Sequence, residues 1–123
     1  MSADIFVSKR IYLYRPAEAG LKATITKMIE ENLGKSLDGY EIDHIQIDLA
    51  HWRGYGLAGW LDERDCGDGM DISRSQLMEL AEDCEKGLVL DVDKEFAAEI
   101  AADIHKILKD FPEEAYFRVT VWC

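Results

Sequence analysis

The chain has 123 residues, 48% of them hydrophobic and three of them tryptophan, which predicts a folded globular domain rather than a disordered segment. Its formal net charge is −11, which disfavours direct binding to nucleic-acid backbones and to anionic membranes. Because no signal peptide and no apolar run of about 20 residues is recognised, we expect a cytoplasmic protein that makes no membrane contact.

The first third of the chain predicts a strand, a helix and a second strand. Apolar and aromatic side chains alternate over residues 4–15, and Pro16 ends this strand and suits the first turn of a helix. A second strand is expected over residues 40–49. The helix between them is closed by Gly34, and its helical spacing predicts a buried stripe of Leu21, Ile25, Met28, Ile29 and Leu33.

The central stretch predicts two helices on either side of an acidic loop over residues 62–71. Ser73 and Gln76 fit a capping box at the start of the second helix, which ends at Gly87. The first helix is expected over residues 50–62, where glycines allow another backbone to approach closely. The residues expected to share one face of this helix are Trp52, Tyr55, Gly56, Gly59 and Trp60.

The last third predicts a short apolar segment, a long helix and a closing strand. Residues 88–90 fit either a strand stub or a loop that plugs the core. A helix over residues 93–111 is expected, capped by Asp91 or Asp93 and followed by Pro112, and then a strand over residues 115–122. The order of elements predicts a single α+β domain over residues 1–123, with a small, mostly antiparallel sheet of about three strands packed against about four helices.

The negative charge is concentrated in the later part of the chain. Residues 1–35 carry six basic and four acidic side chains, whereas residues 36–123 carry eight basic and twenty-one acidic ones. Between Glu79 and Asp103, nine acids are accompanied by Lys86 and Lys94 alone. Such a field favours encounters with basic surfaces, although acidic composition also serves solubility in many proteins.

Several residues of the central stretch together resemble a family of small, uncharacterised proteins of tailed phages and prophages. The resemblance covers about a third of the chain and implies a phage or prophage origin and a related fold rather than an activity. Trp60 comes one residue earlier than in the family, and Ala58-Gly59 replaces a position where the family often has His. The matching residues are Trp52-Arg53, Trp60, Asp65-Cys66-Gly67, Ser73-Arg74, Leu77, Cys84 and Trp122.

Two groups of residues are candidates for a binding site. Tryptophan and arginine are enriched at interaction hot spots, which favours Trp52, Arg53 and Trp60, although two indoles beside helix glycines are also typical of a core. The second group consists of acidic side chains, which are Asp62, Glu63, Asp65, Asp68, Asp71, Glu79, Glu82 and Asp83.

Motifs for cofactors, metals and catalysis are weak or absent. Residues 54–59 spell G-x-G-x-x-G, but the parallel strand and acid of a dinucleotide site do not follow, so a glycine-rich packing face is the better interpretation. Either register of a calcium loop places Arg64 and Cys66 at ligand positions. The three cysteines are odd in number and far apart, which predicts free thiols. We expect no metal, no cofactor and no catalytic residue.

The leading hypothesis is an accessory protein of phage or prophage type that presents its acids to a basic surface of another protein, as an inhibitor or nucleic-acid mimic. It would act as a monomer or homodimer. One alternative is a protein that binds a small anionic, nucleotide-like ligand between Trp52, Trp60 and Arg53. The other is a metal-assisted hydrolase that uses the carboxylates of the acidic loop.

Overall fold

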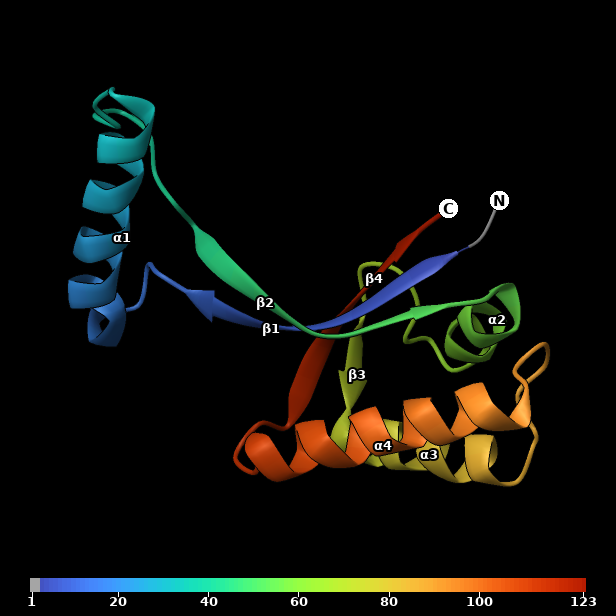
Figure 1. Cartoon of the computed structure of the whole chain (residues 1–123). Helices are drawn as coiled ribbons and strands as arrows, with labels where there is room; N and C mark the ends of the chain where they lie inside the picture. Colours follow the sequence, from blue (N-terminus) through green and yellow to red (C-terminus); the bar gives the residue numbers. More distant parts are fainter. Residues whose placement is uncertain (1–2) are drawn as a thin grey trace. The chain divides into compact units, whose positions relative to one another are not determined.

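The computed structural model describes residues 3–123 and has the predicted α+β architecture. It contains four α-helices, a short 3-10 helix and a four-stranded antiparallel sheet (Figure 1). In chain order the elements are β1 (Asp4–Tyr12), η1 (Pro16–Glu18), α1 (Ala19–Leu33), β2 (His44–Arg53), α2 (Tyr55–Glu63), β3 (Asp71–Ser73), α3 (Arg74–Glu85), α4 (Lys94–Asp110) and β4 (Tyr116–Trp122).

The first and last strands pair with each other in the middle of the sheet. The strand order is β2-β1-β4-β3, and β4 runs antiparallel to both β1 and β3. Ile5 lies opposite Val121 and Val7 lies opposite Val119, so these apolar side chains share one face of the sheet. Ile72 of β3 extends the same face, since it lies opposite the buried Phe117.

The contacts divide the chain into two compact units. The first, called the main unit below, comprises the residues up to Lys9 and Asp48–Cys123, and the second, called the arm unit, comprises Arg10–Ile47. The division falls within β1 and within β2. The main unit contains α2, α3, α4, β3 and β4, whereas the arm unit contains α1.

The hydrophobic core lies in the main unit, between the sheet and its helices. Figure 1 shows α3 and α4 side by side on one face of the sheet. Leu77 and Leu80 of α3 and Ile100 and Ile104 of α4 are completely buried there. The spacing of three and four residues places each pair on one helix face, as the sequence predicts.

Local hydrogen bonds determine where the helices of the main unit begin and end. The capping box of α3 is confirmed, because the Ser73 hydroxyl accepts from the amide of Gln76 and the Gln76 side chain accepts from the amide of Ser73. Asp93 caps α4 by accepting from the amide of Phe96. At the other end of α4, the Arg74 guanidinium donates to the carbonyl oxygens of Leu108, Phe111 and Glu114.

The boundary between β2 and α2 differs from the prediction. The strand was expected to end at Leu49, but it continues to Arg53, and α2 begins at Tyr55. Trp52 therefore lies on a strand and does not share a helix face with Trp60. Strand alternation continues because Ala50 and Trp52 are buried while His51 and Arg53 are exposed. Gly54, with φ 149°, ends the strand in a conformation that favours glycine.

Two other differences concern β3 and α1. The sheet has four strands rather than about three because Asp71–Ser73 pairs with β4, and a strand of three residues carries too little periodicity to recognise. Residues 88–90 form a loop whose Val89 is buried in the core, which is one of the two forms predicted for this segment. The apolar stripe of α1 is not buried as predicted: no α1 residue is buried, and Met28 and Leu33 are 63% and 55% exposed.

Candidate functional site

Trp60 and Arg64 form a cluster that joins α2 to α3. The guanidinium of Arg64 lies over the Trp60 ring, 3.9 Å from its centroid, within the range of a cation–π interaction. The Trp60 indole donates a 2.9 Å hydrogen bond to Asp83. Arg64 also donates to Glu79 at 3.0 Å and lies 3.4 Å from the Asp83 carboxylate. Glu63 also lies 3.7 Å from Arg64, so one arginine is paired with three of the predicted acidic site residues.

Arg64 is the member of this cluster that the sequence analysis missed. It follows Trp60 by four residues and stands directly after the last residue of α2, from where its side chain reaches back over the Trp60 ring. That spacing was a usable signal in the sequence. Because the carboxylates of Glu79 and Asp83 are occupied by Arg64 and Trp60, they are less available to a partner than Glu82, which is exposed on the same helix.

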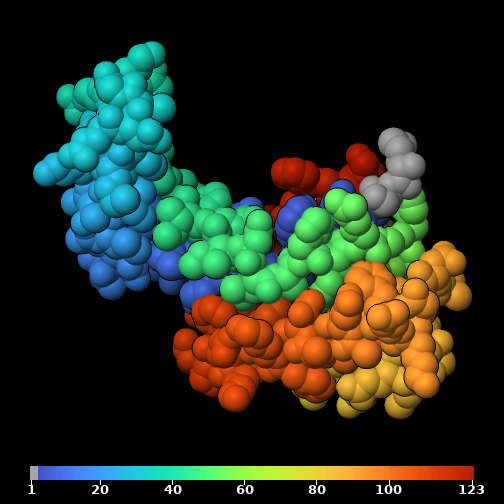
Figure 2. Space-filling model, viewed as in Figure 1, coloured from blue at the N-terminus to red at the C-terminus, as the bar shows by residue number. Residues whose placement is uncertain are grey.

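A groove of about 380 Å³ lies next to this cluster, between α2 and the loop that precedes α4. Figure 2 shows α2 (green) beside this loop (light orange) on the surface of the main unit. The residues that line it are Tyr55, Gly56, Gly59, Trp60, Glu63, Leu88, Leu90 and Asp91. We call it the α2 groove.

The two glycines of the α2 groove have different surroundings. A Cβ atom at Gly56 would overlap the carbonyl oxygen of Leu90, so this glycine permits the close approach of a second backbone that the sequence predicts. A Cβ atom at Gly59 would meet no atom within 4 Å. Gly59 thus leaves open space in the floor of the groove.

The walls of the α2 groove are apolar and its rim is acidic. Leu88 and Leu90 are 63% and 78% exposed, and Tyr55 is also exposed. Glu63 and Asp91 contribute carboxylates to the rim, and both are exposed. Exposed leucines beside carboxylates fit a ligand that is apolar at one end and positively charged at the other.

Trp52 and Arg53 lie apart from the α2 groove. Trp52 is only 2% exposed, and its indole donates a 2.9 Å hydrogen bond to Asp103 of α4. It is a core residue and presents almost no accessible surface. Arg53 is exposed and donates to Asp4 at 2.8 Å, and the same Asp4 oxygen bonds His51 at 2.9 Å. The hydrogen bonds from His51 and Arg53 hold the pKa of Asp4 below its usual range.

The five carboxylates of residues 62–71 do not converge on one point. Asp62 and Glu63 belong to α2, and the Asp62 carboxylate lies against Gly67. Asp68 accepts a 2.8 Å hydrogen bond from the amide of Val121, and Asp71 lies 3.6 Å from Arg118. Several of these acids therefore hold the loop in place. Asp65, with φ 56°, is exposed.

The three cysteines are free, as predicted, and two of them lie in the core. Burial raises the pKa of the Cys66 thiol to about 11, against the opposing effect of the nearby Arg64. Burial also raises the pKa of the Cys84 thiol to about 11. These shifts disfavour the thiolate, the reactive form of cysteine, so neither side chain is suited to act as a nucleophile near neutral pH.

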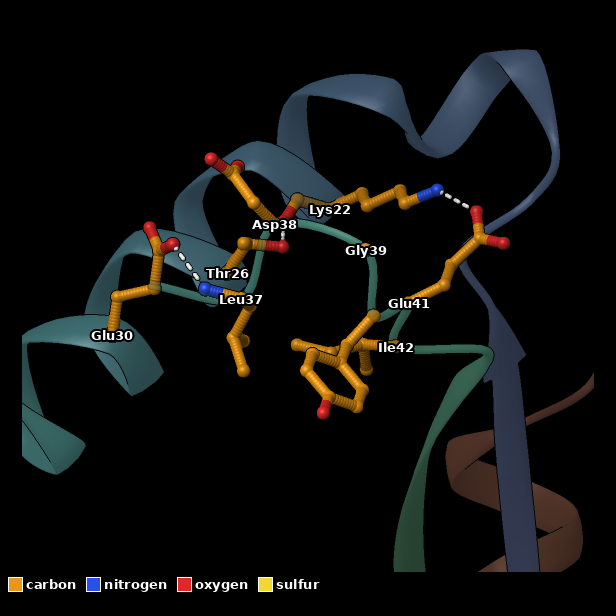
Figure 3. A pocket seen from close by; sticks show the side chains of 9 residues that line it. Lys22, Thr26, Glu30, Leu37, Asp38, Gly39, Glu41 and Ile42 are labelled. Carbon is orange, nitrogen blue, oxygen red and sulfur yellow. Dashed lines mark hydrogen bonds and ion pairs between the residues drawn. The ribbon is translucent and has the colours of Figure 1, made fainter. Parts of the chain in front are cut away.

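The arm unit contains a more polar cavity of about 480 Å³, between α1 and the loop of residues 37–42. Figure 3 shows the Glu30 carboxylate accepting from the amide of Leu37, at 2.7 Å, and Lys22 paired with Glu41. Both charged side chains of α1 that line this cavity are thus used to hold the loop against the helix.

Among residues 3–123, no three His, Cys, Asp or Glu side chains are grouped so that they could hold a metal ion. The helices within the same residues are too short or too polar to cross a bilayer. Comparison of the chain with protein-family models, with curated proteins and with solved structures finds no match.

Proposed function

We propose that this chain is a non-enzymatic accessory protein that binds a basic surface of another protein through the α2 groove. The observation that carries the proposal is an apolar groove with an acidic rim on the unit that holds most of the negative charge. The main unit carries nineteen acidic and nine basic side chains, whereas the arm unit carries six and five. Binding at the groove therefore combines apolar contact with long-range attraction.

The apolar part of the groove would supply most of the affinity. Burying apolar surface contributes about 25 cal/mol per Å², and the exposed side chains of Leu88 and Leu90 have most of their surface to bury. Tyr55 adds an exposed aromatic ring of the kind enriched at hot spots. An arginine or lysine of the partner, next to a leucine or aromatic anchor, would match this arrangement.

The acidic rim would supply specificity and speed of association. Complementary charge raises association rates and makes them sensitive to salt. Glu63 and Asp91 lie at the groove itself, and Glu82 lies exposed on α3. A partner that ordinarily binds nucleic acid would meet a similar field here, which is why we propose inhibition by nucleic-acid mimicry. The phage or prophage origin rests on the resemblance of the central residues.

The α2 groove gives less support to an anionic ligand. A nucleotide-like molecule would meet the carboxylates of Glu63 and Asp91, which repel it. Trp52, which was expected to line such a pocket, lies in the core. The basic-partner hypothesis is therefore the one that the arrangement of side chains favours.

A groove-filling variant tests the proposal without changing the charge. Gly59→Leu would fill the floor of the groove, and it should not destabilise α2 because leucine is the better helix former. Capture of a basic partner from a bacterial extract at about 50 mM salt, identified by mass spectrometry, should be lost in this variant. Capture that is retained by Gly59→Leu places the contact elsewhere.

A charge-neutralising pair tests the acidic rim. Glu63→Gln with Asp91→Asn should weaken binding at least tenfold at low salt, because two charges beside the partner are removed. Asparagine tolerates the positive φ of 58° at Asp91. The matched control is Glu99→Gln with Glu113→Gln, which removes the same charge at exposed positions outside the groove. Equal weakening by both pairs, or binding that does not decline towards about 500 mM salt, would argue against the proposal.

A further inference from the structure

The arm unit has almost no core of its own. It spans Arg10–Ile47, and Leu13 is its one buried side chain. Units of fewer than about 40 residues ordinarily need disulfides, metals or oligomerisation to become stable, because they bury too little surface. Several of its apolar side chains are also exposed, namely Tyr14, Met28, Leu33, Tyr40 and Ile47. A further apolar contact that buries these side chains would therefore stabilise the arm unit.

Apolar side chains form a stripe along α1. Leu21, Ile25, Ile29 and Leu33 recur every four residues, and Met28 lies beside them. Leu21, Ile25 and Ile29 are half-buried, while Met28 and Leu33 are exposed. The loop of residues 37–42 is fastened to α1 through Lys22 and Glu30 (Figure 3). The stripe is therefore partly covered within the single chain, and Met28 and Leu33 are its exposed members.

Four of the stripe residues form the same series of side chains whether they are read from the amino or the carboxyl end of α1. Leu, Ile, Ile and Leu, spaced by four, are symmetric about Lys27. If two copies of α1 lie antiparallel, Leu21 of one copy faces Leu33 of the other, and Ile25 faces Ile29. A two-fold symmetric interface requires this kind of self-complementarity. Rows of residues spaced by four are also the ridges that pack in the commonest class of helix pair, with an interaxial angle of about −50°.

The charge distribution favours a second copy over a basic partner at this surface. The arm unit has a net charge of −1, compared with −10 for the main unit. Two arm units can therefore meet with little repulsion, whereas a basic partner is drawn to the main unit. Lys27 is central to the stripe in sequence but does not belong to it in space. Each residue turns a helix by about 100°, so Lys27 lies about 200° around the axis from Ile25, on the opposite side of α1.

We propose that two copies of this chain associate through antiparallel packing of their α1 helices along the stripe formed by Leu21, Ile25, Met28, Ile29 and Leu33. The interface is isologous and apolar, and it belongs to the arm unit. It uses no residue of the α2 groove, so the association does not depend on the proposed function.

Sedimentation equilibrium of the full chain over a range of concentrations tests this proposal. The wild-type chain should show a mass twice that of the monomer and should dissociate on dilution. Met28→Glu with Leu33→Glu should weaken association at least tenfold, because both side chains are exposed in the single chain and would be buried in the pair. The matched control, Met70→Glu with Met78→Glu, adds the same charge at exposed methionines of the main unit and should leave the association unchanged.

Salt dependence and hydrogen exchange provide independent readouts. Salt screens the repulsion between two negatively charged chains, so the dimer should become tighter between about 50 mM and 500 mM salt, whereas partner binding should become weaker. Amides of residues 19–33 should exchange more slowly as the wild-type concentration rises, a measurement that does not depend on the folding of a variant. A chain that stays monomeric at high concentration and high salt, a dimer that tolerates the α1 pair of substitutions, or exchange that is independent of concentration would each overturn the proposal.

Discussion

Gly56 and Gly59 show that the surroundings of a glycine determine the effect of replacing it. They lie one turn apart on α2, and the sequence treats them alike. Gly56 lies against the carbonyl oxygen of Leu90, whereas Gly59 borders open space. Because a methyl group must displace a backbone at the first position and nothing at the second, the same substitution should have opposite effects.

Gly56→Ala should lower the free energy of unfolding by at least about 2 kcal/mol, since the Leu90 backbone has to move. Gly59→Ala should raise it by up to about 1 kcal/mol through helix propensity. Urea denaturation followed by circular dichroism measures both. Equal effects of the two substitutions would show that the Leu90 carbonyl does not contact α2 in solution.

The three thiols should differ in reactivity. At about pH 8 an alkylating reagent should modify Cys123 rapidly and should modify Cys66 and Cys84 slowly, because burial raises the pKa of both to about 11. Mass spectrometry should find one rapidly modified thiol in the native protein and three rapidly modified thiols in the denatured protein. Rapid modification of all three in the native chain would contradict the burial of the first two.

The same two thiols predict how stability depends on alkaline pH. A folded-state pKa above the ordinary value of 9.0 means that the folded chain prefers the protonated thiol. This contribution is complete below about pH 9 and is lost as the pH rises through about 11. Cys84→Ala should therefore flatten the decline in the free energy of unfolding over this range, as measured by denaturation at successive pH values.

At the scale of elements, arginine side chains connect helices that are separate in the sequence. Arg64 joins α2 to Glu79 and Asp83 of α3, and Arg74 donates to three carbonyl oxygens at the end of α4. Arg53, by contrast, is an exposed residue paired with Asp4. The difference is burial: paired charges that are shielded from water contribute more than exposed ones.

Arg64→Met should therefore lower the free energy of unfolding by about 1–2 kcal/mol, because it removes the cation–π contact with Trp60 and leaves the half-buried Asp83 without its arginine. Arg53→Met should change it by less than about 0.5 kcal/mol. Thermal or urea denaturation of the two variants gives the comparison. A larger effect at Arg53 would reverse the order of importance proposed for these two sites.

At the scale of the whole molecule, the main unit concentrates a net charge of −10. Glu82, Glu95 and Glu99 are exposed on α3 and α4 and add to this field. Self-repulsion of this kind opposes the compact state and is screened by salt. The acidic side chains thus attract a basic partner but lower the stability of the folded chain.

The melting temperature should accordingly rise as salt is increased from about 20 mM to 200 mM. Glu99→Lys should raise it at low salt, because the substitution reduces the repulsion, and this advantage should shrink at high salt. Lys27→Glu in the nearly neutral arm unit provides the opposite change of charge in a weaker field and should have a smaller effect. Scanning calorimetry at both salt concentrations measures the differences.

The sequence predicted the features that depend on neighbouring residues. The capping box at Ser73, the Asp93 cap and the inner faces of α3 and α4 follow from spacing within one segment, and the α+β class follows from the order of the elements. Such local patterns determine secondary structure directly, because the interacting groups are only a few residues apart. The close approach of a backbone to Gly56 was also anticipated, although its partner, Leu90, was not.

Only the tertiary structure determined which distant segments contact one another. Trp52 became a core residue of β2 rather than a partner of Trp60, because its indole pairs with Asp103, 51 residues further along the chain. β3 exists because Asp71–Ser73 finds β4, and the α2 groove exists because Leu88–Asp91 lies against α2. The apolar stripe on α1 is plain in the sequence, yet whether it is buried depends on what packs against it. Contacts between residues far apart in the sequence produce no regular spacing of residue types, so the sequence does not predict them.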